Sequence, residues 1–140
     1  MDLRKITDTF SVSPQINLDD VPAIAKAGFR SILCNRPDGE ELGQIEHAAV
    51  QTAALEAGLE FRCVPITSGS VNETDLTDFN TALAELPAPI LAYCRSGTRC
   101  TMLWSISHMD QMPGEQIIEA TAAAGYDMSG LVAQMSRQRG

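Results

Sequence analysis

The segment Tyr-Cys-Arg-Ser-Gly-Thr-Arg at residues 93–99 constrains the fold and the chemistry of this chain more than any other stretch. It follows a short apolar run at 88–92 and precedes a helical pattern over about 100–110. The sequence therefore predicts a buried strand that ends at Cys94, a small glycine-containing loop, and a helix directly after it. In such a junction successive loop N–H groups can point inward as an anion cradle, to which the helix N-terminus adds partial positive charge.

The residue types in this loop predict a nucleophile rather than a structural cysteine. A cysteine in a positive field should be a thiolate at neutral pH. Arg99 can hold an oxyanion with a bidentate fork, and Arg95 adds a second charge that steers an anionic substrate. Such perturbed groups gather at functional sites, so we expect Cys94 and Arg99 to be catalytic. The transferred group should be bound by the loop residues Arg95, Ser96, Gly97 and Thr98.

The loop resembles two known kinds of active site. Cys94 to Arg99 resembles the six-residue loop of rhodanese-type sulfurtransferases. Its Cys-x4-Arg spacing is one residue shorter than the Cys-x5-Arg loop of tyrosine and dual-specificity phosphatases. Tyr93 stands where those phosphatases usually have histidine, and Cys100 stands where their arginine would fall.

The rest of the chain resembles a small bacterial family, the β-lactamase-hydrolase-like protein phosphatase-like family, which is also labelled a sulfur transferase family. The resemblance implies a cysteine-phosphatase-like α/β fold. Because the domain is sometimes fused to a metallo-β-lactamase-like hydrolase in that family, it also implies such a hydrolase as a partner in sulfide or persulfide metabolism. The stretches that carry it are 27–32, 35–40, the Cys94 loop and 124–127.

The order of apolar patterns predicts a single α/β domain over residues 1–140. Strands alternate with helices, so we expect a central, mostly parallel sheet flanked by helices. Three helices should follow the loop, as in the dual-specificity phosphatase scaffold. The predicted elements are a hairpin at 4–13, strands at 29–34, 60–65 and 88–93, and helices at 17–27, 43–57, 72–86, 100–110, 114–124 and 129–137.

Ligands of such sheets bind beyond the carboxyl ends of the strands, so the loops at 35–42, 66–72 and 94–99 should meet around Cys94. Arg36 is a candidate for the rim of the pocket, although a solvated loop arginine is an equal alternative. Asp38 is a candidate as well, although Pro37-Asp38-Gly39 can be a simple turn. We expect both histidines, 47 and 108, to be surface or structural residues without an acidic partner.

Composition excludes several classes of function. A formal net charge of −8 argues against a general nucleic-acid or anionic-membrane binder. No apolar run reaches the length of a membrane span, and the first residues lack an apolar signal region. The four cysteines form no Cys-x-x-Cys pair, which favours reduced thiols in the cytoplasm. Ligand spacing for zinc is missing, so we expect neither a metal nor a cofactor.

The choice between the two chemistries depends on a general acid. A phosphatase must protonate the departing alkoxide, yet the loop at 66–72 contains no carboxylate. Sulfur transfer has no such requirement. The sequence therefore favours a sulfurtransferase that moves sulfane sulfur from a small anionic donor, thiosulfate or a persulfide, through a Cys94 persulfide to a thiol acceptor.

Two alternatives stay open at this point. The first is a phosphatase that forms a phosphocysteine at Cys94, with Asp38 or Asp75 as the acid. The second is a non-catalytic anion-binding or redox module in which Cys100 is a resolving thiol.

Overall fold

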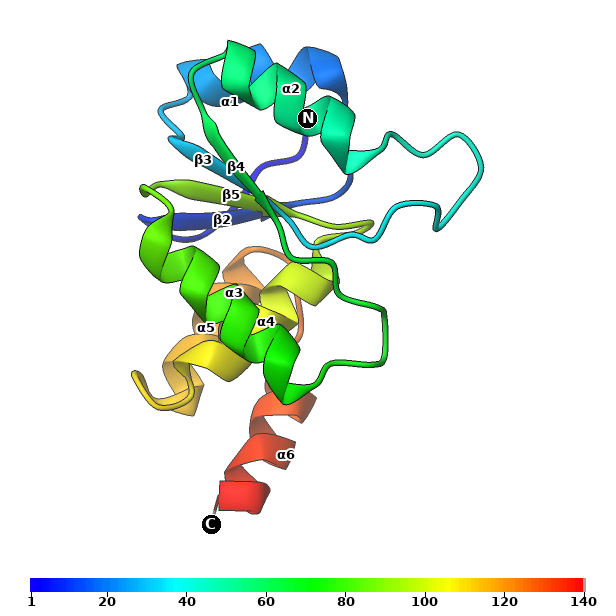
Figure 1. Cartoon of the computed structure of the whole chain (residues 1–140). Coiled ribbons are helices and arrows are strands. Elements are labelled where there is room, and N and C mark those ends of the chain that lie inside the picture. The colour runs from blue at the N-terminus through cyan, green and yellow to red at the C-terminus, as the bar shows by residue number, and fades with distance from the viewer. Residues whose placement is uncertain (140) are drawn as a thin grey trace.

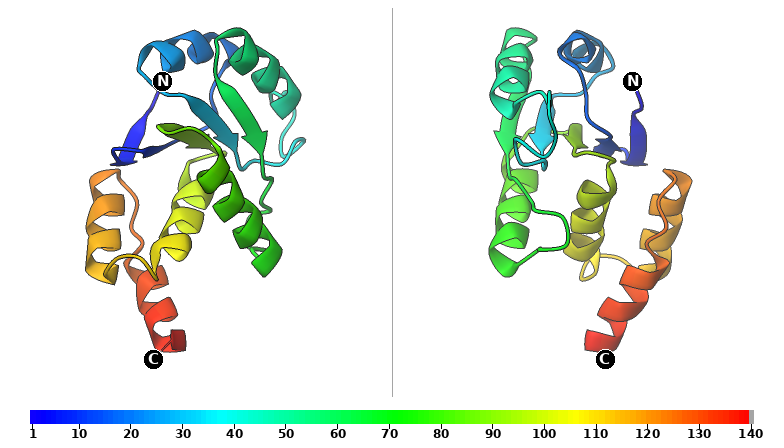
Figure 2. Two further views of the ribbon diagram at one scale, coloured as in Figure 1. Left: turned by 60° about the vertical axis from the view of Figure 1, so that its left-hand side comes forward. Right: turned by 90° about the vertical axis from the view of Figure 1, so that its right-hand side faces the viewer.

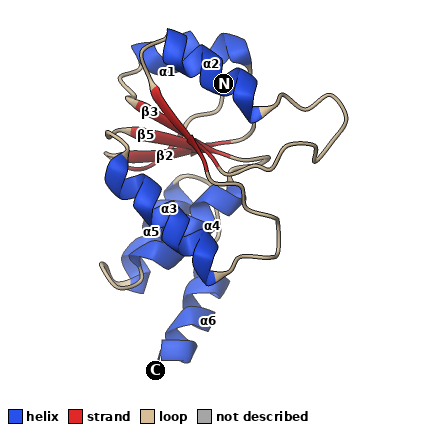
Figure 3. Cartoon of the chain, in the orientation of Figure 1, coloured by secondary structure: helices blue, strands red, loops and turns tan. Residues whose placement is uncertain are grey.

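The computed structural model describes residues 1–139 and consists of one five-stranded sheet between two layers of helices (Figure 1; Figure 3). The strand order is β1-β2-β5-β3-β4; β1 and β2 are antiparallel, and all other neighbours are parallel. The predicted mostly parallel sheet flanked by helices is confirmed. The strands are β1 (Arg4–Thr7), β2 (Phe10–Ser13), β3 (Ser31–Cys34), β4 (Glu60–Cys63) and β5 (Ile90–Tyr93).

The helices divide unequally between the two faces of the sheet (Figure 1; Figure 2). A short 3-10 turn (Leu18–Asp20), α1 (Val21–Lys26) and α2 (His47–Glu56) cover one face. On the other side lie α3 (Glu73–Glu85), α4 (Thr98–His108) and α5 (Gly114–Ala123), and α6 (Ser129–Arg139) packs against α4 and α5 and points away from the sheet. Cys94 and the helix that follows it belong to this second, thicker layer.

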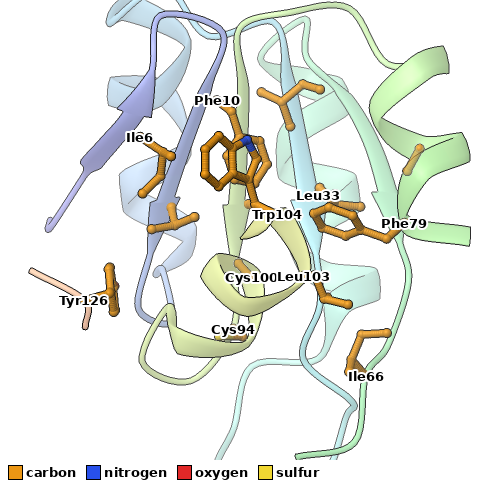
Figure 4. Packing of buried hydrophobic residues seen from close by; sticks show 14 of the residues in the cluster. Ile6, Phe10, Leu33, Ile66, Phe79, Cys94, Cys100, Leu103, Trp104 and Tyr126 are labelled. Carbon is orange, nitrogen blue, oxygen red and sulfur yellow. The ribbon is translucent and has the colours of Figure 1, made fainter. Parts of the chain in front are cut away.

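Aromatic packing anchors the start of that layer on the sheet. Phe10 of β2 stacks on Trp104 of α4 with ring centroids 6.4 Å apart, and it meets the edge of Phe79 of α3 at 6.2 Å (Figure 4). Trp104 is 1% exposed, as expected for a core residue. Because this aromatic cluster holds α4 against the sheet, it also fixes the position of the loop at the N-terminus of α4.

The α2 helix differs from the helix predicted at 43–57. Leu55 is 60% exposed, whereas Val50 and Ala54 are fully buried. The helix begins at residue 47 rather than 43, and four of its ten residues are alanine. An alanine-rich helix of this length has no single apolar stripe, so its packing against α1 and the sheet decides which side is inside.

Local capping follows the sequence closely elsewhere. Asn72 accepts a hydrogen bond from the Asp75 amide, and the Asp75 carboxylate accepts one from the Asn72 amide, so a capping box starts α3. Gly28 ends α1 in the left-handed region with φ of 100°. Within residues 1–139, no helix has the length and hydropathy needed to cross a membrane.

Candidate active site

The Cys94 loop lies where the parallel strands end. Cys34, Cys63 and Tyr93 are register partners at the last positions of β3, β4 and β5, so the loops that follow these strands leave from one edge. The chain turns at Gly97, which has φ of 90° and caps α4. A left-handed residue is needed there, which accounts for the glycine. Because α4 begins at Thr98 rather than at 100, Arg99 lies in the first helical turn.

Cys94 is surrounded by donors that stabilise its thiolate. The Cys100 thiol, the largest influence, lowers the pKa of Cys94 against the effect of burial, and the N–H groups of Cys100, Gly97 and Arg99 lower it further, to about 5. The Gly97 nitrogen lies 3.1 Å from the sulfur. Burial raises the pKa of Cys100, so it stays a thiol and remains a donor. Cys100 thus acts as a hydrogen-bond donor to the Cys94 sulfur.

Arg99 is held in place by Glu40, a residue that sequence reasoning missed. Its Nη1 donates to Glu40 Oε2 at 2.7 Å and its Nη2 donates to Glu40 Oε1 at 2.8 Å. Nη1 also donates to the Ile66 carbonyl at 2.9 Å. The pairing lowers the pKa of Glu40 to about 2, so the carboxylate stays charged at neutral pH. The loops after β3, β4 and β5 therefore do meet, as the topology predicted.

Arg36 is a buried side chain that donates a hydrogen bond to Glu40. Its side chain is 1% exposed, and its Nε donates to Glu40 Oε1 at 2.8 Å. Its other nitrogens donate to Gln15 Oε1 at 3.0 Å and to Glu41 Oε1 at 3.1 Å. Arg36 is therefore neither a rim residue nor a solvated loop arginine, the two roles that the sequence left open. It orients the Glu40 carboxylate, which in turn orients Arg99. Its spacing of four residues from Glu40 was the one local signal.

The two carboxylates considered as general acids have other local roles. Asp38 accepts a hydrogen bond from the His47 amide at 2.9 Å, and its Oδ2 lies 2.8 Å from His47 Nδ1. His47 therefore does have an acidic partner, contrary to expectation. Asp75 belongs to the cap of α3. Asp38 therefore binds the first residue of α2, and Asp75 caps the N-terminus of α3.

The remaining loop residues differ in exposure. Arg95, Ser96 and Thr98 are exposed, and Gly97 is buried. Arg95 Nη2 lies 3.7 Å from Glu41 Oε2 in a solvent-exposed pair. Arg95 is therefore a solvent-exposed cation of the loop, whereas the Arg99 side chain is only 10% exposed.

Comparison with known proteins places this geometry in a family. Residues 2–111 match the model described as "Beta-lactamase hydrolase-like protein, phosphatase-like domain". The beta-lactamase hydrolase-like protein of Xylella fastidiosa (strain Temecula1) is 35% identical over 140 residues, which are 99% of this chain and 32% of that protein. The chain thus spans about a third of the curated relatives that it matches.

Solved structures support the same fold. A candidate phosphatase from Neisseria meningitidis Z2491 is 32% identical, with a TM-score of 0.86 and 98% of both chains covered. Tk-PTP in its active form has a TM-score of 0.68 at 14% identity, with 98% of this chain and 95% of that chain covered, and shows likeness of fold alone. The domain is phosphatase-like. These comparisons do not support the sulfurtransferase interpretation and favour its phosphatase alternative.

Proposed function

The chain belongs to the beta-lactamase hydrolase-like protein, phosphatase-like domain family, and from that premise we propose that it hydrolyses phosphate monoesters through a phosphocysteine at Cys94. The thiolate attacks phosphorus, the P–O bond to the leaving group breaks, and the phenolate or alkoxide departs with the bonding electrons and takes a proton from water. Water then attacks the phosphocysteine, the S–P bond breaks, and phosphate and the thiolate are released.

The observation that carries this proposal is the fork between Arg99 and Glu40. Glu40 and the Ile66 carbonyl occupy Nη1 and one side of Nη2. Within residues 1–139, the Nε of Arg99 makes no hydrogen bond to protein, so Nε and the second N–H of Nη2 form a free edge. Such an edge binds two oxygens of a phosphoryl group at once, which is the recognition that a single point charge cannot give.

The positive groups at this edge favour the transition state for phosphoryl transfer. Charge spreads over the equatorial oxygens of the phosphoryl group during transfer, and fixed donors aimed at those oxygens stabilise it. Here the donors would be the Arg99 edge, the loop amides and the N-terminus of α4. Glu40 is tied to both arginines, so Arg99 needs no reorganisation when substrate enters.

The preferred substrates are aryl phosphates. The loop at 66–72 has no carboxylate, and Asp38 and Asp75 are engaged at His47 and at the cap of α3. A phenolate leaves with little help from an acid, whereas an alkoxide must be protonated as it leaves. We therefore expect phosphotyrosine-like esters to react much faster than phosphoserine-like esters.

Sulfur transfer is the second candidate, and one observation favours it. The loop from Cys94 to Arg99 has six residues, as in rhodanese-type enzymes, and sulfur transfer requires no general acid. In that reaction the thiolate takes the sulfane sulfur of thiosulfate as sulfite leaves, and a thiol acceptor then takes the sulfur from the persulfide.

One purified protein, three substrates and one variant separate the candidates. Initial rates are measured with an aryl phosphate, with phosphoserine, and with thiosulfate plus a thiol acceptor, for the wild type and for Cys94→Ser. We expect aryl phosphate turnover to be the fastest and to be abolished by Cys94→Ser. Faster sulfur transfer from thiosulfate, with a persulfide on the Cys94 peptide, would overturn the phosphatase proposal in favour of the second candidate.

A further inference from the structure

The peptide bond between Ser96 and Gly97 is hydrogen-bonded on both of its sides. On the inner side, the Gly97 N–H points at Cys94 Sγ, with a nitrogen–sulfur distance of 3.1 Å. On the outer side, the Ser96 carbonyl accepts a hydrogen bond from the Tyr126 hydroxyl at 2.9 Å. A trans peptide is planar, and its N–H and C=O point in opposite directions. A partner that holds the carbonyl outward therefore holds the N–H inward.

This peptide would be free to rotate without such a partner. Gly97 has φ of 90°, and glycine adopts positive and negative φ with similar ease. A flip of the Ser96–Gly97 peptide would turn the N–H away from the sulfur and present the carbonyl oxygen in its place. A carbonyl oxygen disfavours a thiolate, whereas an N–H stabilises it. The orientation of this peptide thus decides whether one of the N–H groups that lower the pKa of Cys94 faces its sulfur.

Tyr126 is well placed to fix that orientation. It is 7% exposed, its own amide donates to the Thr121 carbonyl at 2.9 Å, and the Arg4 guanidinium carbon lies 5.0 Å from its ring centroid. Arg4 also donates to the Ala124 carbonyl at 3.3 Å, which ties the segment after α5 to β1. Figure 4 shows Tyr126 on this separate C-terminal segment, beside the turn that follows Cys94.

The contact between Tyr126 and Gly97 is close enough to exclude a side chain. A Cβ placed on Gly97 would collide with the Tyr126 hydroxyl and would lie 3.0 Å from Cζ. The tyrosine therefore occupies the space next to the peptide that would have to rotate. Tyr126 lies beyond residues 2–111, the part of the chain that matches the family model.

We propose that Tyr126 is a positioning residue whose hydroxyl latches the Ser96–Gly97 peptide so that the Gly97 N–H faces the Cys94 sulfur. The consequence for turnover rests on the proposed function of Cys94. The latch itself is a property of the loop and can be measured on the thiol without any substrate.

Tyr126→Phe is the direct test because it removes the hydroxyl and keeps the ring. The other groups that face Cys94, namely Cys100 and Arg99, remain, as does Arg4 beside the ring. The measurement is the pH dependence of Cys94 alkylation by iodoacetamide, followed by peptide mass spectrometry. Losing one N–H donor should raise the apparent pKa of Cys94 by about one pH unit and lower the thiolate fraction near pH 5 several-fold. The acid limb of the kcat/KM profile should move by the same amount.

Two further variants distinguish the loss of the Tyr126 hydroxyl from a general loosening of this segment. Thr121→Val removes another buried hydroxyl from the same segment, one that donates to the Ile117 carbonyl, and it should leave the pKa of Cys94 unchanged. Arg4→Met loosens the ring of Tyr126 without touching the loop and should give a smaller shift in the same direction.

An unchanged pKa in Tyr126→Phe would overturn the latch, as would equal shifts in Tyr126→Phe and Thr121→Val, since equal shifts would indicate general loosening. A raised pKa in Tyr126→Phe, in a protein whose wild type hydrolyses no phosphate ester, would support the latch and refute the phosphatase proposal.

Discussion

Two pairs of cysteines lie at the carboxyl edge of the sheet, on its opposite faces, and they differ in how far the pKa of one thiol is lowered. Cys94 and Cys100 belong to the layer of α3 to α6, and Cys34 and Cys63 face the layer of α1 and α2. In each pair one thiol donates to the other sulfur and is the main cause of a lowered pKa. The pKa of Cys94 is lowered to about 5 and that of Cys34 to about 7.

The difference between the pairs lies in the backbone. Backbone groups of three residues, Cys100, Gly97 and Arg99, lower the pKa of Cys94, whereas the backbone of one residue, Arg36, lowers the pKa of Cys34. After β3 the amides continue the ladder, since the Asn35 N–H donates to the Tyr93 carbonyl. After β5 the chain leaves the ladder through Gly97 and its amides turn inward. The pKa of Cys94 is therefore lowered further than that of Cys34 because the chain after β5 no longer forms strand hydrogen bonds and its N–H groups can point at the sulfur.

The largest expected effect separates the two pairs by activity. Cys94→Ser should reduce aryl phosphate hydrolysis by at least about a thousandfold, because no covalent intermediate can form. Cys34→Ser removes the equivalent thiol on the other face and should retain most of the activity. Initial rates of the two purified variants provide the measurement. Comparable losses of activity in both variants would contradict this difference between the pairs and would show that Cys34 takes part in turnover.

The next effect concerns the ion cluster that lies only on the Cys94 side. Glu40→Gln leaves Arg36 and Arg99 without their shared carboxylate, and Arg36 is 1% exposed. Because the Glu40 side chain is 22% exposed, removing its charge from this partly buried network should lower the free energy of unfolding by about 1.5–3 kcal/mol. Urea denaturation measures it. Glu85→Gln, which breaks an exposed pair with Arg62, is the matched control and should cost about 1 kcal/mol or less.

A loss of less than about 1 kcal/mol in Glu40→Gln would mean that the ion cluster contributes little to stability.

The pKa of Glu40 also predicts how the stability of the fold depends on pH. Because that pKa is lowered to about 2 from an ordinary 4.5, the stabilisation is fully present above about pH 4.5 and is lost as the pH falls toward 2.

A smaller effect sharpens the role of the guanidinium. Arg99→Lys keeps the charge but loses the fork to Glu40 and the free edge, so kcat/KM for an aryl phosphate should fall about tenfold or more. Arg62→Lys is the control because Arg62 pairs with Glu85 away from the loop. Wild-type values for Arg99→Lys would show that charge alone suffices and that the fork has no catalytic use.

The smallest effects belong to the carboxylates that the sequence offered as acids. Asp75→Asn should weaken the capping box of α3 by about 1 kcal/mol and leave aryl phosphate turnover within about twofold. Asp38→Asn should likewise act on its contact with His47 rather than on rates. A loss of the basic limb of the pH–rate profile in either variant would identify it as the missing acid.

The sequence predicts the parts of this site that are local. The strand, the glycine turn and the helix around Cys94 follow from seven consecutive residues, and so does the lowered pKa of the thiol. The α3 cap follows from Asn72 and Asp75. These features depend on neighbours in the chain, so propensity and spacing are sufficient to predict them.

The parts that could not be predicted depend on pairing across the fold. Glu40 lies 59 residues before Arg99, and Tyr126 lies 30 residues after Ser96. Neither residue has a local pattern that reveals its partner, because a carboxylate in a loop or a tyrosine after a helix is ordinary in isolation. The burial of Arg36 has this origin only in part: its partner Gln15 lies 21 residues before it, whereas Glu40 and Glu41 follow it by four and five residues.

The central claim is that the loop sets Cys94 apart from the other three thiols, and one titration tests it most directly. The native wild-type protein is alkylated with iodoacetamide across a pH series, and each cysteine peptide is quantified by mass spectrometry. We predict that Cys94 reacts with an inflection near pH 5 and that Cys34 follows near pH 7. Cys63 and Cys100, whose pKa values are raised, should react last. Alkylation of Cys34 before Cys94, or one common inflection for all four thiols, would contradict the account.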